Sequence, residues 1–365
     1  MNATQQLHDL GQSLWLDNIT RYLLTSGTLA RYIKDFAVTG LTSNPTIFEH
    51  AIGKSDAYDE AIRSQAGTAE SDEALFFRLA IEDLTRAADL FRPAFDASAG
   101  VDGWVSLEVS PLLADDSSKT IAAAAQLHAR AARPNLFIKI PGTPAGITAI
   151  EESIFAGVPI NVTLLFSCAH YVAAAEAYLR GIERRIAAGR DPAVNSVASL
   201  FVSRWDVATH DRLPPALRNR LGIAVAKQTY RAYRELLASP RWRKLAAAGA
   251  RMQRLLWAST GTKDPAAPDT LYIEALAAPE TIDTIPEKTL AAFADHGEVG
   301  PSMPRDGGDA DAVIDECRRA GIDDAALALE LQREGAAAFS KSWHELLGGI
   351  RAKREALTPA NAPLD

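Results

Sequence analysis

The sequence predicts a single (β/α)8 (TIM) barrel with extra helices at its C-terminal end. Short runs rich in Val, Ile, Leu and Phe alternate with longer segments of helical period, which is typical of βα units around a parallel sheet. Eight such runs occur, and eight strands close a barrel. Because no linker-like run, repeat or low-complexity tract appears within residues 1–357, we expect one domain there and a flexible tail over residues 358–365.

The strand candidates share a short, nearly continuous apolar character. Strands of a parallel sheet are buried on both faces, so they lack the alternation of a half-exposed strand. The expected ranges, in chain order, are 13–19, 37–43, 103–109, 135–140, 159–166, 196–202, 253–259 and 271–276.

The ends of several intervening helices can be read from capping residues. Ser71 is expected to cap a helix that reaches about Phe91 and stops before Pro93. Ser167 is expected to cap another, which Gly189 ends.

The last third of the chain carries further helix signals. Pro286 and Gly297 are expected at the first helical position and at C′ of one helix. Residues 297–308 contain two prolines and four glycines and are expected to form a surface loop. This loop should join the barrel to a helical extension over residues 323–357, whose last part, near 343–355, has the pattern of an amphipathic, solvated helix.

The composition excludes several function classes. The chain is 47% hydrophobic and 23% charged, as in ordinary globular proteins, and its net charge of -8 argues against a general nucleic-acid surface. The two cysteines, Cys168 and Cys317, lie far apart without CxxC spacing, which suggests a reducing cytoplasm. Neither a signal peptide nor a run of about 18 apolar residues is present, so neither export nor a membrane span is predicted.

No metal or cofactor is predicted either. The seven histidines show no HxH or HExxH spacing, and no GxGxxG or GxxxxGK[ST] motif follows a strand. These patterns leave the oligomeric state open between a monomer and a homodimer.

Polar residues lie at or near the C-terminal ends of nearly all the strand candidates. This is the face of a barrel on which active sites are built, and an isolated charge among apolar strand residues is costly unless it is paired or catalytic. Taken singly, most such residues are more often structural. The set consists of Asp17, Asn44, Glu108, Lys139, Asn161, Thr163 and Ser199.

Lys139 is the most informative of these residues, since it stands in the apolar run FIKIP and lysine is almost never buried without a reason. Burial of a lysine favours the neutral amine, which can attack a carbonyl and form an iminium. The iminium is an electron sink that allows a neighbouring bond to break, provided that a carboxylate accepts a hydroxyl proton and a second acid or base assists dehydration. Asp17 and Glu108 supply such a pair.

The sequence resembles the transaldolases, in particular the long bacterial form, over about residues 10–350. A single matching segment would be weak evidence, but six occur in order. They are LGQSLWLDNITR (10–21), VTGLTSNPTIF (38–48), NLFIKIPGTPAG (135–146), INVTLLFS (160–167), SLFVSRWD (199–206) and LLWASTGTKDP (255–265).

The resemblance implies a role for each candidate catalytic residue. Lys139 matches the lysine that forms the Schiff base, and Asp17 matches the general acid/base for carbon–carbon cleavage. Glu108 matches the residue that shuttles protons through a bound water, which the residue matched by Thr163 holds.

The resemblance also implies a set of substrate-binding residues. Asn44 and Asn161 match amides that bind the hydroxyls of the dihydroxyacetone unit, with Thr42 close to them. Ser199 and Arg204 match phosphate-binding positions, and Phe201 matches an aromatic residue of the pocket wall.

One position departs from the short form of the family. There, an arginine that helps to bind phosphate follows the seventh strand, whereas this chain has Lys263 in the corresponding segment. A lysine can act as a point charge but does not reproduce the two-donor geometry of an arginine.

The activity implied is transfer of a dihydroxyacetone unit from sedoheptulose 7-phosphate to glyceraldehyde 3-phosphate, giving erythrose 4-phosphate and fructose 6-phosphate. This is a cytoplasmic step of the non-oxidative pentose phosphate pathway, and it needs sugar-phosphate substrates but no cofactor. Two alternatives remain at this point: a fructose-6-phosphate aldolase that uses the same imine, and a catalytically silent barrel that only binds sugar phosphates. The silent binder has no need of a buried amine between two carboxylates.

Overall fold

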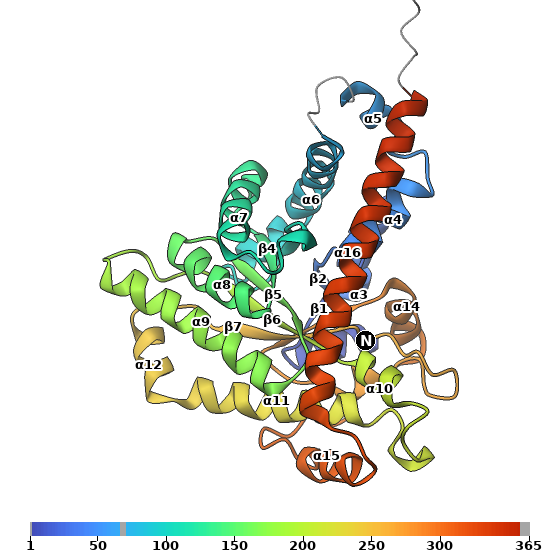
Figure 1. Ribbon diagram of the computed structural model, residues 1–365. Coiled ribbons are helices and arrows are strands. Elements are labelled where there is room, and N and C mark those ends of the chain that lie inside the picture. The colour runs from blue at the N-terminus through green and yellow to red at the C-terminus, as the bar shows by residue number, and fades with distance from the viewer. Residues whose placement is uncertain (1, 66–70, 358–365) are drawn as a thin grey trace, which may run out of the picture.

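A closed barrel of eight parallel strands forms the centre of the protein, as predicted (Figure 1). The computed structural model describes residues 2–65 and 71–357, so the expected tail at 358–365 lies outside the described residues. Neighbouring strands in the barrel are also neighbours in the chain, and β8 pairs with β1 to close it. The strands are β1 Ser13–Leu16, β2 Val38–Leu41, β3 Val105–Glu108, β4 Leu136–Pro141, β5 Ile160–Leu165, β6 Ser196–Phe201, β7 Gln253–Ala258 and β8 Thr281–Ile285.

The predicted position of the eighth strand was wrong. Residues 271–276 form a one-turn helix, α13 (Leu271–Ala275), and the strand follows as TIDTI, with Asp283 at its centre. Periodicity cannot distinguish a short apolar helix from a buried strand, and the true strand has too few apolar residues to stand out. Pairing with β7 and β1 forms the strand despite its weak local signal.

Helices connect the strands and surround the barrel (Figure 1). They are α1 Ala3–Asp9, α2 Arg21–Thr25, α3 Thr28–Phe36, α4 Pro45–Gly53, α5 Asp59–Gln65, α6 Asp72–Ala97, α7 Ser117–Ala131, α8 Pro144–Ala156, α9 Cys168–Ala187, α10 Ser203–Thr209, α11 Leu221–Ala238, α12 Pro240–Ala247, α14 Glu287–His296, α15 Ala310–Arg319 and α16 Asp324–Leu357. Short 3-10 turns occur at Pro111–Leu113 and Pro215–Leu217. The long loop and the helical extension after α14 agree with the sequence, although α15 was not expected.

Two helices require correction at their predicted ends. Ser71 caps α6 as expected, but the helix continues through Pro93 to Ala97. A proline removes one backbone donor, and packing compensates here because Phe95, beyond the proline, packs edge-on against Trp104 at 5.2 Å.

The second correction concerns α14. Pro286 is its N-cap rather than its first residue, and Gly297 ends it in an extended conformation, with φ of -66°, rather than in a left-handed C′ turn. The cap of α9 by Ser167 is as predicted.

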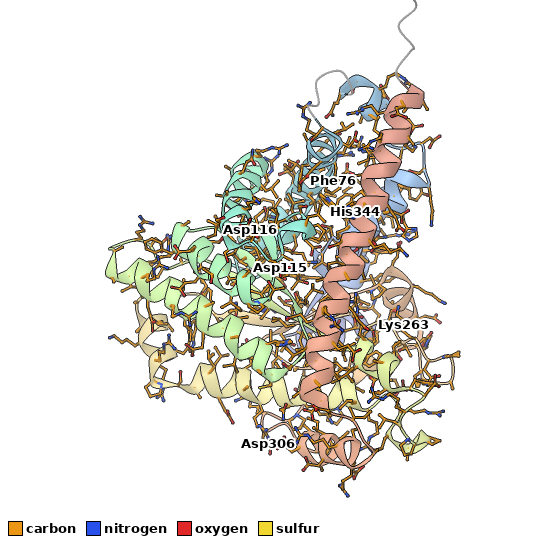
Figure 2. The ribbon with its side chains drawn as sticks, in the orientation of Figure 1. Phe76, Asp115, Asp116, Lys263, Asp306 and His344 are labelled. Atoms are coloured by element: carbon orange, nitrogen blue, oxygen red, sulfur yellow. The ribbon has the colours of Figure 1, made fainter. Side chains whose placement is uncertain are left out.

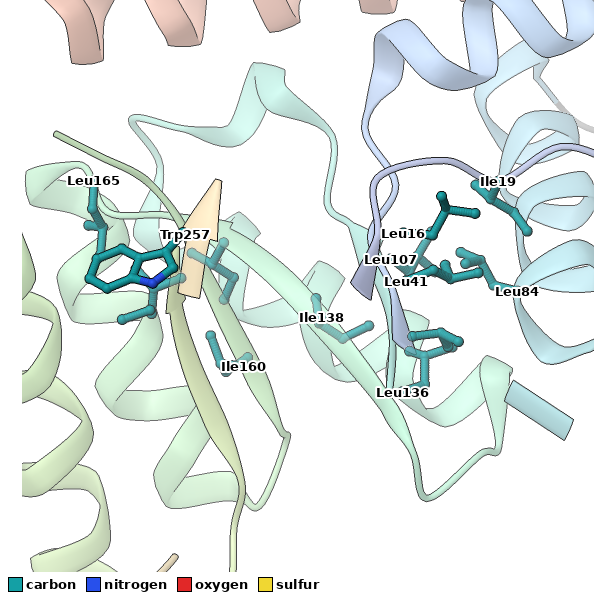
Figure 3. Close-up of a cluster of buried hydrophobic side chains, with 14 of the residues drawn as sticks. Leu16, Ile19, Leu41, Leu84, Leu107, Leu136, Ile138, Ile160, Leu165 and Trp257 are labelled. Atoms are coloured by element: carbon teal, nitrogen blue, oxygen red, sulfur yellow. The ribbon is translucent and has the colours of Figure 1, made fainter. Parts of the chain in front are cut away.

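Alternate side chains of each strand enter two different layers. One layer lies between strands and helices and includes Leu136 and Ile138 of β4 (Figure 3). The other fills the barrel and includes Phe137 of the same strand. Because strand side chains alternate with a period of two, Lys139 must follow Phe137 into the barrel. The same rule turns Ser199 of β6 inward after Val197.

The N-terminal end of the barrel is closed by a buried polar network around Asp102. This carboxylate accepts hydrogen bonds from Ser13, from Trp15 Nε1 at 2.8 Å and from Thr39 Oγ1 at 2.8 Å. Arg254 joins the network through Ser13 Oγ at 2.7 Å. Buried polar groups that are this well satisfied stabilise a unique arrangement.

The last helix, α16, extends across the opposite, C-terminal end of the barrel and then packs along α4 (Figure 1). Gln332 Nε2 anchors it by donating to the carbonyl oxygens of Gly142 and Leu164, both at 3.0 Å. Thr46 and Ser342 share a hydrogen bond of 2.8 Å further along. Among the helices of residues 2–65 and 71–357, none is both long and apolar enough to cross a membrane.

Asp283 provides a test of the packing around β8. It is fully buried, its Oδ1 accepts from Thr260 at 2.8 Å, and its Oδ2 has no partner in the described part of the chain. Burial raises the pKa of Asp283 to about 7, and the Thr260 hydrogen bond only partly opposes this rise. Because the fold favours the protonated form, the stability that this group contributes is complete below its ordinary pKa and is lost as the pH rises through 7.

We therefore expect Asp283→Asn to flatten the decline in unfolding free energy between about pH 5 and about pH 8, by up to about 3 kcal/mol. Urea unfolding of both proteins at the two pH values measures this. The exposed Asp211 provides a control, since Asp211→Asn should leave the slope unchanged. A slope in Asp283→Asn equal to that of the wild type would contradict the assignment.

Candidate active site

A pocket opens at the C-terminal end of the barrel, between the strand ends and α16. Of the residues predicted for the site, nine line it: Asp17, Thr42, Asn44, Lys139, Thr163, Ser199, Phe201, Arg204 and Lys263. The two others, Glu108 and Asn161, lie in the layer beneath. The sequence did not identify a further part of the lining, which comprises Ala258, Ser259, Gly261, Thr284, Pro286 and Phe339.

Lys139 lies at the bottom of this pocket and is only 5% exposed. Its Nζ donates to the carbonyl oxygen of Ser43 at 2.9 Å and lies 3.7 Å from Glu108 Oε2. The register of the barrel explains the pairing, because Glu108 of β3 and Lys139 of β4 are direct neighbours. One side of the amine is thus held by backbone, and another faces a carboxylate.

Glu108 is 7% exposed, and its Oε2 has no hydrogen-bond partner within the described residues. Burial raises the pKa of Glu108 to about 7, although the nearby Lys139 lowers it and Asp17 raises it further. A carboxyl group with such a pKa can give or take a proton near neutral pH.

Asp17 follows β1 and is partly exposed to the pocket. Thr42 Oγ1 donates to its Oδ1 at 2.8 Å and also shares a hydrogen bond of 2.7 Å with Thr284 Oγ1. Burial among these groups raises the pKa of Asp17, while Lys139 and the Thr42 hydrogen bond oppose the rise. Thr42 at the end of β2, itself held by Thr284 of β8, therefore fixes the orientation of this carboxylate.

Asn161 lies below the pocket surface, fully buried and beside Lys139 in the strand register. Its Oδ1 accepts from Ser199 Oγ at 2.7 Å, and its Nδ2 donates to Ser106 Oγ at 3.1 Å. Thr163, two residues further along β5, has a buried hydroxyl without a partner in the described chain. This hydroxyl faces the pocket and is available to a water molecule or a substrate.

Asn44 lines the pocket from the start of α4. Its Oδ1 caps this helix by accepting from the backbone N–H of Ile47 at 3.0 Å. The cap fixes the side chain, and its Nδ2 is the group left to face the pocket.

Arg204 and Lys263 supply positive charge at the pocket mouth. Arg204 is the second residue of α10, and its guanidinium lies 5.0 Å from the ring centre of Phe201 and 5.9 Å from that of Phe339. Within residues 2–65 and 71–357, the Arg204 side chain makes no ion pair or hydrogen bond. Burial lowers the pKa of Arg204, whereas the charges of Glu334 and Asp17 raise it. Lys263 is exposed in the loop that follows β7 (Figure 2).

Two of the lining residues that the sequence did not identify were missed for different reasons. Thr284 lies on β8, which was assigned to the wrong segment. Phe339 lies on α16, whose sequence pattern predicts an amphipathic helix but carries no signal for which loop ends it covers. In the described part of the chain, no group of three or more His, Cys, Asp or Glu is arranged to hold a metal ion.

Comparison with known proteins identifies the family of the chain. The profile of the family described as transaldolase/fructose-6-phosphate aldolase matches residues 14–350. The chain belongs to this family. The resemblance to transaldolases that the six segments suggested is therefore confirmed.

Curated transaldolases cover nearly the whole chain. The transaldolase of Parafrankia sp. (strain EAN1pec) is 46% identical over 93% of this chain and 95% of its own length. That of Thermobifida fusca is 45% identical, with 97% and 99% covered, and that of Thiobacillus denitrificans is 44% identical, with 96% and 100% covered.

The pair of Glu108 and Lys139 provides a test of the electrostatics in this transaldolase-family pocket. Removing the cation by Lys139→Met should raise the pKa of Glu108 above about 7, because Lys139 lowers it. Removing the other carboxylate by Asp17→Asn should lower the pKa of Glu108, because Asp17 raises it.

Side-chain carboxyl titration by ¹³C NMR, with Glu108→Gln to assign the resonance, measures both shifts. Two shifts of the same sign would contradict the arrangement, since the two neighbours carry opposite charges.

Proposed function

We propose that the protein is a transaldolase that transfers a dihydroxyacetone unit through a Schiff base on Lys139. The observation that carries this proposal is a buried lysine amine 3.7 Å from Glu108, at the bottom of a pocket that Asp17 also lines. Membership of the transaldolase/fructose-6-phosphate aldolase family supports it. The donor would be sedoheptulose 7-phosphate and the acceptor glyceraldehyde 3-phosphate, in the cytoplasmic non-oxidative pentose phosphate pathway.

Imine formation begins once Lys139 has given up a proton, so that its amine is neutral. Its lone pair attacks C2 of the ketose, the carbonyl oxygen takes a proton, and a carbinolamine forms. Loss of the C2 hydroxyl as water then gives the iminium. Glu108 can accept the proton of the amine and deliver a proton to the leaving hydroxyl, since its pKa is about 7. A water held by the free Thr163 hydroxyl is suited to relay this proton.

Carbon–carbon cleavage follows from the iminium. Asp17 takes the proton of the C4 hydroxyl, the C3–C4 bond breaks, and its electron pair moves into the iminium to form an enamine. The aldehyde part of the donor leaves, and the three-carbon unit stays on Lys139. The enamine then attacks the aldehyde of the acceptor, Asp17 returns its proton to the new hydroxyl, and hydrolysis frees the product.

Substrate orientation depends on the rest of the pocket. Asn44 is suited to bind hydroxyls of the three-carbon unit, and Ser199 and Arg204 are suited to bind the phosphate at the other end of the sugar. Asn161, which is hydrogen-bonded to Ser199, would act on the substrate only after giving up part of this bonding or by holding Ser199 in place.

A fructose-6-phosphate aldolase is the second candidate, because the family description names both activities. It would use the same enamine and release dihydroxyacetone to water. The two differ in the lifetime of the enamine against protonation, so a coupled assay with and without an acceptor aldehyde distinguishes them. Erythrose 4-phosphate formed only from a mixture of donor and acceptor supports the transferase.

The Schiff base is tested by trapping. Borohydride added with fructose 6-phosphate should leave a reduced three-carbon adduct on Lys139, because reduction makes the iminium irreversible. Peptide mass mapping identifies the residue. The exposed Lys119 is a matched control, and an adduct there, or no adduct, would refute the mechanism.

The phosphate site is tested by comparing two cations. Arg204→Ala should raise KM for fructose 6-phosphate by roughly ten- to a hundredfold, since a charge-assisted contact contributes about 1.5–3 kcal/mol. KM for fructose, which lacks the phosphate, should hardly change. Kinetics of both sugars with wild type, Arg204→Ala and Lys263→Ala measure this. A selective loss in Lys263→Ala alone would move the phosphate role to Lys263.

A further inference from the structure

The guanidinium of Arg204 is held at the pocket wall without any ion pair or hydrogen bond among the described residues. It lies between the rings of Phe201 and Phe339, at 5.0 Å and 5.9 Å from their centres. It is therefore held by these ring contacts and by packing, together with longer-range attraction to Glu334 and Asp17. Since Phe339 and Glu334 belong to α16, the surface of this helix helps to decide where the charge lies.

Gly335 of α16 lies at this contact and is buried. A Cβ atom built on Gly335 would come within 3.0 Å of Arg204 Nη1 and within 2.9 Å of Leu164 Cδ2. Both distances are shorter than ordinary van der Waals contacts, so either side chain would have to move. The guanidinium occupies its position because residue 335 has no side chain.

The other close atom belongs to the Leu164 side chain, which projects from a fixed part of β5. Leu164 has a left-handed conformation with φ of 58°, which is unusual for a leucine, at a bulge in β5. Gln332 fixes this bulge by donating to the Leu164 carbonyl oxygen. Since Gln332 and Gly335 lie one turn apart on the same helix, α16 is held close to β5 where Gly335 meets Arg204.

We propose that Gly335 is a specificity-determining residue, which by lacking a side chain lets the Arg204 guanidinium lie against α16 and so sets where the substrate phosphate binds. This inference rests on the proposed function of Arg204 as the phosphate ligand. Gly335 touches no substrate itself and acts as a positioning residue.

The glycines of α16 offer a matched control. A Cβ atom on Gly348 would meet nothing within 4 Å, and this residue is exposed on the same helix. Gly→Ala favours the helical conformation at either position. Gly335→Ala and Gly348→Ala therefore differ in the contact with Arg204 and Leu164 and not in helix propensity.

The experiment measures KM and kcat for fructose 6-phosphate and for fructose in both variants. Gly335→Ala should raise KM for the phosphorylated sugar about three- to tenfold, because it displaces the guanidinium by a few tenths of an ångström. KM for fructose, and both sugars in Gly348→Ala, should stay within about twofold of wild type. Thermal unfolding should show a small loss of Tm in Gly335→Ala, because the added Cβ crowds Leu164, and none in Gly348→Ala.

The combination with Arg204→Ala distinguishes a positioning role from a merely structural one. If Gly335 acts through Arg204, Gly335→Ala should have no further effect in the Arg204→Ala background. The inference would be overturned if Gly335→Ala raised KM equally for both sugars. It would also be overturned if Gly335→Ala raised KM as much in the Arg204→Ala background as in the wild type.

Calorimetric binding of inorganic phosphate needs no turnover and separates this inference from the proposed function. Weaker phosphate binding in Gly335→Ala than in Gly348→Ala would support it even if no adduct formed on Lys139. Equal binding in the two variants, or no binding to wild type, would overturn it even if the adduct did form.

Discussion

Closure of the barrel is the constraint on which the rest of the structure depends. In a closed parallel sheet every second side chain must enter the interior, so one position decides whether a residue joins the apolar core or the pocket. Phe137 packs in the barrel interior and Lys139, two residues later, reaches the pocket. The register then sets Glu108 beside this amine. The pair is a consequence of strand pairing and needs no specialised loop.

The sequence was most informative where a charge interrupted an apolar strand. Lys139 could be singled out because a charge is costly in such a setting, whereas Glu108 and Thr163 were only noted as polar residues of strands and received their roles from the resemblance. Arg204 and Lys263 were assigned by resemblance, since their own neighbourhoods are ordinary. The eighth strand could not be recognised because long-range pairing with β1 and β7, rather than local hydrophobicity, forms it.

The sequence also could not predict how deeply each polar residue lies beneath the pocket surface. Asn161 and Ser199 are both polar residues of strands, yet only Ser199 reaches the surface, and Asn161 lies beneath it with both amide atoms hydrogen-bonded. Phe339 and Gly335 belong to a helix distant in sequence from every strand end. Their contribution depends on how α16 crosses the barrel, which Gln332 fixes through two backbone carbonyl oxygens.

Buried polar atoms without partners occur at both ends of the barrel. At the N-terminal end, Asp102 accepts hydrogen bonds from several side chains, but Gln12 Oε1 and Gln253 Oε1 lack partners within the described residues. At the C-terminal end, Glu108 Oε2 and the Thr163 hydroxyl likewise lack partners in the described chain. Unsatisfied buried groups cost stability, and of these two pairs only the second lies at the pocket or beside Lys139, where a bound molecule could satisfy it.

The crossing of α16 over the pocket also affects when the protein matures. A ribosome makes the chain from its N-terminus, so all eight strands can pair before residues 324–357 have been synthesised. Until that last helix docks, the wall that contains Phe339 is missing and Arg204 has nothing to lie against on that side. A nascent barrel would thus already carry Lys139, whereas the pocket wall around Arg204 would be complete only when synthesis is almost finished.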